Sequence, residues 1–477
     1  MNKAYGVCLG LLALVLAGFG APASRAGSRL AAGGAAAGSE TETTSTTSST
    51  TTPTASSAAD LRQRIDALKA ELVDLNQELA TEQEPAAPAA DVPQGQGSPA
   101  PATPPAAPAT APTGPTPLPS PSITAPLSTA VPHEISAGPF GKLEITGTLS
   151  GIGLVENNGV IPNTPISHWD VSNAQVFVQK TTGWFQFYLQ GGAYNIVTLG
   201  TPFAPTGATV ANIYGPLPVG YVKLVKGNFN VEVGELPTLI GAEYTFSFEN
   251  MNIERGLLWG QEEGVSRGIQ LNETYKKLTL ALSYNDGFFS NRYTTLSGSA
   301  AWAFNAANTL SFVASGNAGA YARVGSAATP LLQNNSNIYN VIYTFSKGNW
   351  MITPYYQYTS IAKDTKVFIT EGAHTNGGAL LANYNFKHGI SLAVRPEYIK
   401  SAGGSAADVN SINPLGYGPG SGAFSFTVTP AYVKDGFFLR GDISVVDLTS
   451  STSGFRFGLT GTSTNQVRGV IEAGVMF

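Results

Sequence analysis

The final eleven residues of the chain, VRGVIEAGVMF (467–477), alternate between two kinds of side chain. Every second residue from Val467 to Phe477 is apolar or small, and the residues between them include Arg468 and Glu472. Side chains alternate between the two faces of a β-strand, so this stretch predicts a strand with one apolar and one charged face. Such a strand is typical of a transmembrane β-barrel, in which the apolar face meets lipid and the polar face lines the lumen.

The same alternation recurs upstream, from Phe140 onward, and is clear in residues 278–284, 339–345, 390–398 and 437–445. Short turns rich in Lys, Gly, Asn or Asp divide these runs, and they lie at residues 180–183, 226–228, 276–277, 305–308, 347–349, 387–389 and 434–436. Longer connections alternate with the turns, near residues 156–169, 195–214, 238–263, 286–292, 320–335, 361–374, 402–421 and 448–463.

Seven turns and eight loops join sixteen strands. We therefore predict an all-β fold, an antiparallel transmembrane barrel over residues 140–477, with fourteen or eighteen strands as alternatives. The even strand number puts both ends of the barrel on the side of the short turns, which should be the periplasm. A soluble β-sandwich or solenoid is the competing interpretation, but it would not explain aromatic residues beside the turns, such as Trp184 and Trp350.

Composition supports the barrel. Only 12% of the 477 residues are charged, about half of what soluble proteins carry. The longest apolar run, Val7 to Phe19, has 13 residues and is too short for a spanning helix, which needs about 20. A cytosolic enzyme and a helical membrane protein are both disfavoured.

The N-terminus has the pattern of a secretory signal peptide over residues 1–23, with cleavage after Ala23 or Ala26. Cleavage would remove Cys8, the one cysteine, and with it any disulfide or thiolate chemistry. Residues 24–59 are rich in Gly, Ala, Ser and Thr, and we expect them to be disordered. Residues 85–139 are rich in proline and predict an extended linker.

Between these two segments, residues 60–84 predict a short coiled-coil helix. Its apolar residues are spaced four and three apart in turn: Leu61, Ile65, Leu68, Leu72, Leu75 and Leu79. So narrow an apolar stripe favours self-association, as a homotrimer if the barrel is a porin. The alternative is an amphipathic helix that lies on a barrel or membrane surface.

A sixteen-stranded barrel is too wide for side chains alone to fill, so the prediction includes a water channel. The third long loop, 238–263, is the longest and is acidic. If it folds inward it would line a constriction with its carboxylates, Glu243, Glu249, Glu254, Glu262 and Glu263, beside a single Arg255.

Strand parity places three arginines on the lumen face, each with a carboxylate nearby on the same face. These pairs are Arg395 with Glu397, Arg440 with Asp442, and Arg468 with Glu472. In one interpretation the arginines stand across the channel from the acidic loop and create a transverse field. In the other, each arginine pairs with its neighbour and braces the wall.

No catalytic, metal or cofactor site is predicted. Gly264 to Gly268 matches a nucleophile-elbow pattern in letters, but a strand follows where the motif needs a helix. The four histidines have no metal-ligand spacing, and a chain with a pI of about 5.5 offers no basic patch for nucleic acid.

The segment GELPTLIGAEYTFSFENMNIERGLLW (234–259) resembles the OmpL-like β-barrel porins. The leader, heptads, linker and terminal Phe477 are together similar to Gram-negative outer-membrane porins, including DcaP-type porins with an N-terminal coiled coil. The resemblance implies an outer-membrane channel, surrounded by lipid and trimeric, for passive diffusion of small hydrophilic solutes. The alternative function is a structural tether, in which a closed barrel is linked to peptidoglycan through the periplasmic helix and linker.

Overall fold

The computed structural model describes residues 132–159, 166–319, 330–405 and 412–477. The predicted signal peptide, the tract 24–59, the heptad helix 60–84 and the linker up to residue 131 lie outside the described residues.

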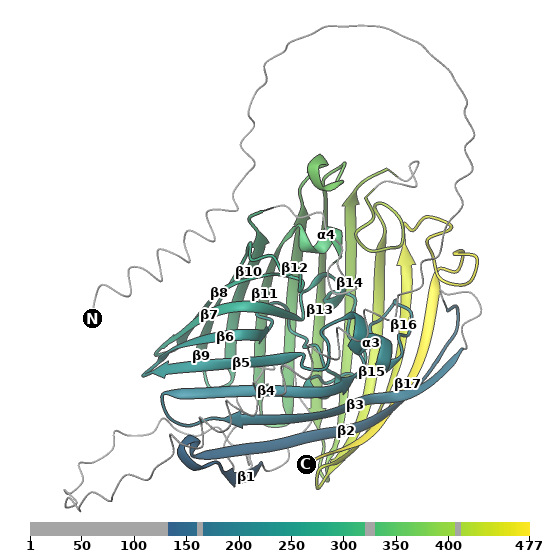
Figure 1. Ribbon diagram of the computed structural model, residues 1–477. Coiled ribbons are helices and arrows are strands. Elements are labelled where there is room, and N and C mark those ends of the chain that lie inside the picture. The colour runs from purple at the N-terminus through teal and green to yellow at the C-terminus, as the bar shows by residue number, and fades with distance from the viewer. Residues whose placement is uncertain (1–131, 160–165, 320–329, 406–411) are drawn as a thin grey trace, which may run out of the picture. The chain divides into compact units, whose positions relative to one another are not determined.

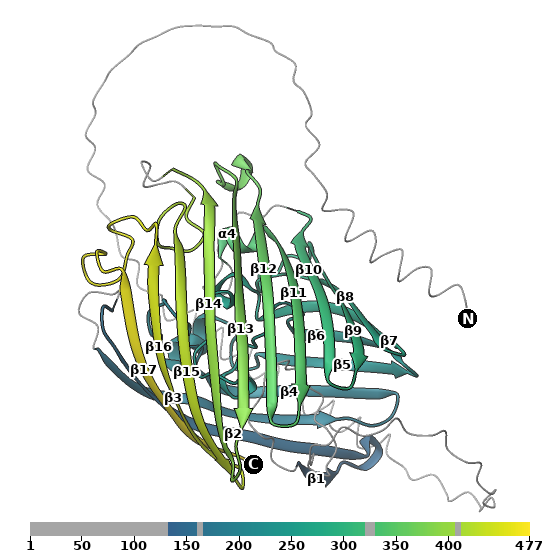
Figure 2. The same cartoon turned by 180° about the vertical axis from the view of Figure 1, so that it is seen from behind.

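Sixteen antiparallel strands form a closed barrel, which confirms the predicted fold and strand number. Each strand from β2 onward pairs with the next, and β17 pairs with β2 to close the ring. Figures 1 and 2 show the strands as one continuous wall in two opposite views. The strands are β2 (Lys142–Glu156), β3 (Ser167–Lys180), β4 (Phe185–Tyr194), β5 (Val219–Lys226), β6 (Phe229–Pro237), β7 (Val265–Tyr275), β8 (Leu278–Asn285), β9 (Thr295–Asn305), β10 (Asn308–Asn317), β11 (Ser336–Lys347), β12 (Trp350–Ile361), β13 (Ala373–Asn385), β14 (Ile390–Gly403), β15 (Gly422–Lys434), β16 (Phe437–Thr449) and β17 (Asn465–Met476).

A short strand precedes the barrel, in the stretch that the sequence assigned to the end of the linker. This strand, β1 (His133–Ser136), pairs with the start of β2, from His133 opposite Ile145 to Ser136 opposite Lys142. A 3₁₀ turn, η1 (Gly138–Phe140), joins the two.

The seven short connections between strands fall at the seven predicted turns. The turn from β15 to β16 consists of Asp435 and Gly436, with φ of 51° and 83°. Positive φ at both residues is the type I′ geometry that matches the twist of a two-residue hairpin. The sequence located these turns because few residue types adopt that conformation.

The outer face of the barrel is apolar, as the alternation predicted. Exposed side chains on it include Trp302, Tyr356, Ile443 and Val475. In the described part of the chain, no helix is long and apolar enough to cross a membrane.

The loop between β6 and β7, residues 238–264, is called loop 3 here; it folds into the barrel. Residues 240–258 are all buried. Leu258 of the loop belongs to an apolar cluster with Ile342 and Leu381 of the wall, while Phe246 belongs to a second cluster with Phe177. Loop 3 therefore packs against opposite sides of the wall. It contains two 3₁₀ turns, η2 (Ser247–Glu249) and η3 (Trp259–Gln261).

The loop between β4 and β5 lies beside loop 3. The Arg255 N–H donates to the Val197 carbonyl at 2.7 Å, and the Leu199 N–H donates to the Arg255 carbonyl at 2.9 Å. Its helix α3 (Thr206–Asn212) begins with the Thr206 N–H donating to Asp170 Oδ2 at 2.7 Å. The described residues contain two further short helices, α4 (Leu331–Asn334) and η4 (Thr365–Val367).

Candidate constriction site in the barrel lumen

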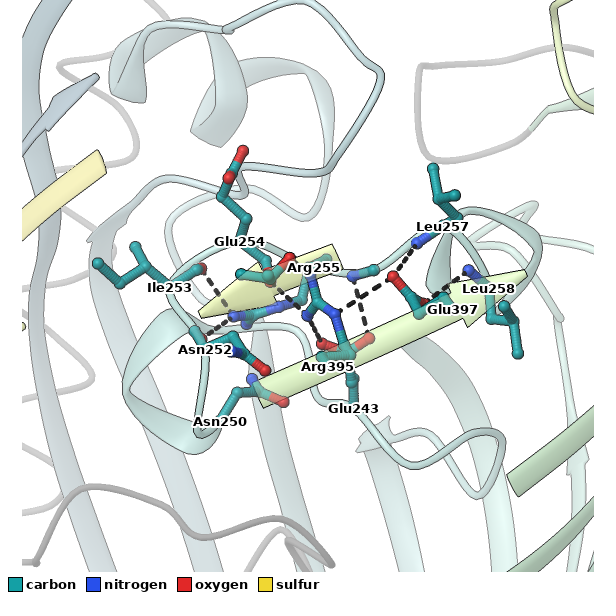
Figure 3. A network of polar contacts seen from close by, with 12 residues as sticks. Glu243, Asn250, Asn252, Ile253, Glu254, Arg255, Leu257, Leu258, Arg395 and Glu397 are labelled. Atoms are coloured by element: carbon teal, nitrogen blue, oxygen red, sulfur yellow. Dashed lines mark hydrogen bonds and ion pairs between the residues drawn. The ribbon is translucent and has the colours of Figure 1, made fainter. Parts of the chain in front are cut away.

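Arg395 is the centre of a polar network that joins the wall to loop 3. It lies on the lumen face of β14, with Glu397 two residues further along. Its Nη1 lies 2.5 Å from Glu243 Oε1 of the loop, and its Nε lies 3.2 Å from Glu397 Oε2. All three side chains are fully buried. Figure 3 shows Arg395 and Glu397 projecting from the strand toward the loop.

Two wall carboxylates accept hydrogen bonds from the backbone of loop 3. Glu397 accepts from the Leu257 N–H at 3.1 Å and from the Leu258 N–H at 3.4 Å (Figure 3). Asp442 Oδ2 on β16 accepts from the Ile253 and Glu254 N–H groups, both at 2.9 Å. Irregular backbone inside a barrel needs partners for its N–H groups, and these carboxylates supply them.

The other two arginines that parity assigned to the lumen face pair with carboxylates on adjacent strands. Arg440 on β16 donates to Glu472 Oε2 on β17 at 2.9 Å and 2.7 Å, and to the Asn250 carbonyl of loop 3 at 2.8 Å. Arg468 on β17 contacts Glu156 Oε2 on β2 at 2.8 Å and Glu254 Oε1 of loop 3 at 3.2 Å. Each arginine therefore bonds both the wall and the loop.

Three further charged residues of loop 3 bond within the loop or to the strand behind it. Arg255 folds back onto its own loop and donates to the carbonyls of Tyr244, Asn252 and Ile253. Glu249 accepts from the Phe246 N–H at 3.1 Å and closes η2. Glu263 accepts from Ser297 Oγ of β9 at 3.3 Å.

Burial shifts the pKa values of several loop groups. It raises the pKa of Glu263 to about 7, with Asp286 adding to the effect. It raises the pKa of Glu262 well above its usual range, and Glu243 and Glu397 add to this. Burial also lowers the pKa of Arg255 to about 10. Burial penalises the charged form in each case.

The ion pairs of the three arginines combine the two interpretations of the sequence, in which the arginines either face the acidic loop or pair with a carboxylate of the wall. Arg395 contacts both its strand neighbour Glu397 and the acidic loop. Arg440 pairs with Glu472 instead of Asp442, and Arg468 pairs with Glu156. Glu156 was not predicted as a partner, although its lumen-facing parity at the end of the first barrel strand could have identified it.

The terminal residue helps to close the barrel. The Phe477 N–H donates to the Gly147 carbonyl at 3.0 Å, and the Gly147 N–H donates to the Phe477 carbonyl at 2.6 Å. A Cβ at Gly147 would collide with the Phe477 ring, so glycine makes room for it.

The stretch Gly264 to Gly268 lies at the start of strand β7. Ser266 lies in strand β7, which begins at Val265, and not at a strand-to-helix turn. Across the described ranges, no group of three His, Cys, Asp or Glu side chains is arranged to hold a metal ion.

Residues 142–477 match the family described as "Putative beta-barrel porin-2, OmpL-like". No curated protein matches the chain by sequence. Among solved structures, the chain is similar to OmpT of Vibrio cholerae, with 8% identity, coverage of 72% of this chain and 100% of that one, and a TM-score of 0.47. It is also similar to an anion-selective porin from Comamonas acidovorans (11% identity, 70% and 99% coverage, TM-score 0.48) and to the channel DcaP of Acinetobacter baumannii (10% identity, 70% and 97% coverage, TM-score 0.44).

Proposed function

Because the chain belongs to the OmpL-like β-barrel porin family and forms a closed barrel, we propose that it is an outer-membrane channel for passive diffusion of small hydrophilic solutes, with loop 3 as its constriction. The observation that carries this proposal is the docking of loop 3 on wall arginines at the centre of a sixteen-stranded barrel. A barrel of this strand number is wide enough for a channel, and a loop inside it narrows the path.

The packing of loop 3 predicts a narrow path. Its residues 240–258 are buried, and its contacts extend to both sides of the wall. We therefore expect small conductance steps and exclusion of larger solutes. The channel acts by diffusion and not as an enzyme.

Self-association as a homotrimer and surrounding outer-membrane lipid are part of the same proposal. The heptad residues that would mediate trimerisation lie outside the described residues. The proposed periplasmic position of the helix and linker follows from the barrel's even strand number.

Reconstitution tests the function. Liposomes that contain the full mature chain should swell in sugars, amino acids and dicarboxylates small enough to pass the constriction. In planar bilayers, Glu254→Lys and Glu263→Lys should reduce conductance or cation preference, because both side chains lie in the buried loop. Glu273→Lys is the matched control, since Glu273 shares the outward parity of Ile269 and Tyr275 on β7. Unchanged conductance and selectivity in both loop variants would reject loop 3 as the constriction.

A further inference from the structure

A groove on the outer face of the barrel lies across β5, β6 and β7, near the end that carries loop 3. It is called the charged groove here, and its volume is about 660 Å³. Exposed apolar side chains line it: Leu189, Leu217, Val233, Ile269, Tyr284 and Tyr293. Gly220 of β5 lies among them, and the atoms nearest to a Cβ at this position are the flexible ends of Leu189 and Leu217, the first at 3.4 Å.

Two charged residues line the charged groove from neighbouring strands. Glu235 lies near the end of β6 and Arg267 near the start of β7, and the two are directly opposite in register. Glu235 shares the outward parity of Val233, and Arg267 shares that of Ile269. Charged side chains on a lipid-facing wall are costly in mid-membrane and are tolerated near the interface. An ionisable side chain that faces lipid marks a candidate functional site.

Arg267 does not form an ion pair with Glu235, although it is the residue opposite. Its Nε and Nη2 both lie 2.9 Å from Asp286 Oδ2, and Nη2 donates to the Phe289 carbonyl at 3.1 Å. The guanidinium also lies over the Phe289 ring, 3.9 Å from its centre. Nη1 of Arg267 has no hydrogen-bond partner among the described residues, and Glu235 forms no hydrogen bond or ion pair with any of them. The charged groove therefore offers an unpaired carboxylate beside a guanidinium nitrogen that can still donate.

A second groove on the outer face has no such charges. It lies across β15, β16, β17 and β2, and its volume is about 720 Å³. Its exposed side chains are apolar, with Trp169, Ile443 and Ile471 among them. Arg440 and Asp442 belong to its floor, but both side chains bond loop 3 in the lumen and are at most 2% exposed. This second groove can take hydrocarbon alone, whereas the charged groove can also bind a polar group.

We propose that the charged groove binds one membrane lipid with a phosphoethanolamine headgroup, whose primary ammonium group bonds Glu235 and whose phosphate bonds Nη1 of Arg267. The inference rests on the outer-membrane position in the proposed function and does not depend on conductance. The headgroup carries a cation and an anion on a short link, which matches the two neighbouring charges of opposite sign. The acyl chains lie along the exposed side chains of Leu217, Val233 and Ile269.

The charge balance of the groove favours a lipid with an ammonium group. Asp286 already balances Arg267, so the charge that remains is the negative charge of Glu235. A partly buried carboxylate gains most from a donor that carries a positive charge, because charge-assisted hydrogen bonds are the strong ones. A phosphate without an ammonium group would meet Glu235 as a like charge.

The first test is lipid binding by the full mature chain in a neutral detergent, measured by native mass spectrometry. Phosphatidylethanolamine should bind roughly tenfold more tightly than phosphatidylcholine or phosphatidylglycerol, since a hydrogen bond between charged groups is worth about that factor. Phosphatidylcholine keeps the positive charge but has no N–H to donate, and phosphatidylglycerol has no cation. The two lipids therefore separate the hydrogen bond from the charge.

The second test removes the carboxylate. Glu235→Gln should abolish the preference for phosphatidylethanolamine, because the amide keeps the shape of the side chain and loses its charge. The barrel should fold normally, since Glu235 makes no bond that would be lost. Asp447→Asn is the matched control, because Asp447 is an exposed carboxylate on the outer face of β16 that lines neither groove.

The third test fills the groove. Gly220→Leu adds an apolar side chain where the neighbouring side chains can move aside, and it should reduce phosphatidylethanolamine binding roughly tenfold. Gly469→Leu adds the same side chain to the second groove, where the nearest atom to a Cβ is Val155 Cγ2 at 3.4 Å. This control should keep the preference for phosphatidylethanolamine.

The outcomes separate this inference from the channel proposal. Equal affinity of the wild-type chain for the three lipids, or an unchanged preference in Glu235→Gln, would overturn the lipid site. Oligomers that dissociate in Glu235→Gln, without any lipid preference in the wild type, would make the charged groove an interface between copies and would also overturn it. A chain that prefers phosphatidylethanolamine through Glu235 and never conducts would support the lipid site and reject only the channel.

Discussion

Arg395 on β14 and Glu243 in loop 3 lie 152 residues apart in the chain, yet their side chains form an ion pair of 2.5 Å with both fully buried. This pair joins the wall of the barrel to the loop inside it. Since a buried charge that loses its partner is strongly destabilising, the docked position of loop 3 depends on this arginine.

Replacing Arg395 should therefore release the loop while the barrel persists. Arg395→Met leaves Glu243 and Glu397 without their cation, a loss of about 3–5 kcal/mol in the free energy of loop docking. A loss of about 3 kcal/mol would accelerate the hydrogen exchange of the backbone amides in residues 240–258 roughly 100-fold. Lys400→Met removes a positive charge from an exposed position on the same strand and is the control. Equal exchange in both variants would show that the loop is held by apolar packing instead.

Asp442 should hold loop 3 in place through the two hydrogen bonds that it accepts from backbone N–H groups of the loop. Asp442→Ala leaves the Ile253 and Glu254 amides without an acceptor inside the barrel, at about 1–3 kcal/mol for each. The conductance should become noisier as this part of the loop moves, and exchange of these two amides should rise. Asp447→Ala on the same strand has an exposed side chain and should change neither. A quiet channel in Asp442→Ala would contradict this role.

The raised pKa of Glu263 predicts a pH dependence of stability. Burial raises the pKa of Glu263 from 4.5 to about 7, so the folded protein holds this proton more tightly than the unfolded chain. The stabilisation is complete below about pH 4.5 and is lost as the pH rises to about 7, a difference of about 3 kcal/mol. Glu263→Gln should reduce this loss, as measured by denaturation in detergent at pH 4.5 and 7.5. The same pH response in the variant and the wild type would refute the assignment.

The sequence predicted the barrel well because the barrel is built from local patterns. The alternation at residues 467–477 and turns such as Asp435–Gly436 depend only on neighbouring residues. Parity assigned Arg395, Arg440 and Arg468 to the lumen face, and in the structure each of them is at most 2% exposed.

The sequence could not predict the partners of those arginines, because the partners depend on the register between neighbouring strands and on the closure of the barrel. Arg440 lies directly opposite Glu472 on β17, and directly opposite residues are closer than residues two apart on one strand. Arg468 meets Glu156 only because β17 pairs with β2. The acidic character of loop 3 was predicted, with Glu262 among its carboxylates, but a loop has no period that would show which partner each carboxylate meets.

The role of loop 3 as the constriction can be tested by the single-channel conductance of the full mature chain with and without the buried part of this loop. Residues 240–258 are replaced by a short Gly/Ser linker, and both proteins are shown to fold by their heat-modifiable mobility. We expect small, discrete steps for the native chain and several-fold larger steps for the variant, because the loop narrows a barrel of sixteen strands. Equal conductance in the two proteins, or none in either, would contradict this role.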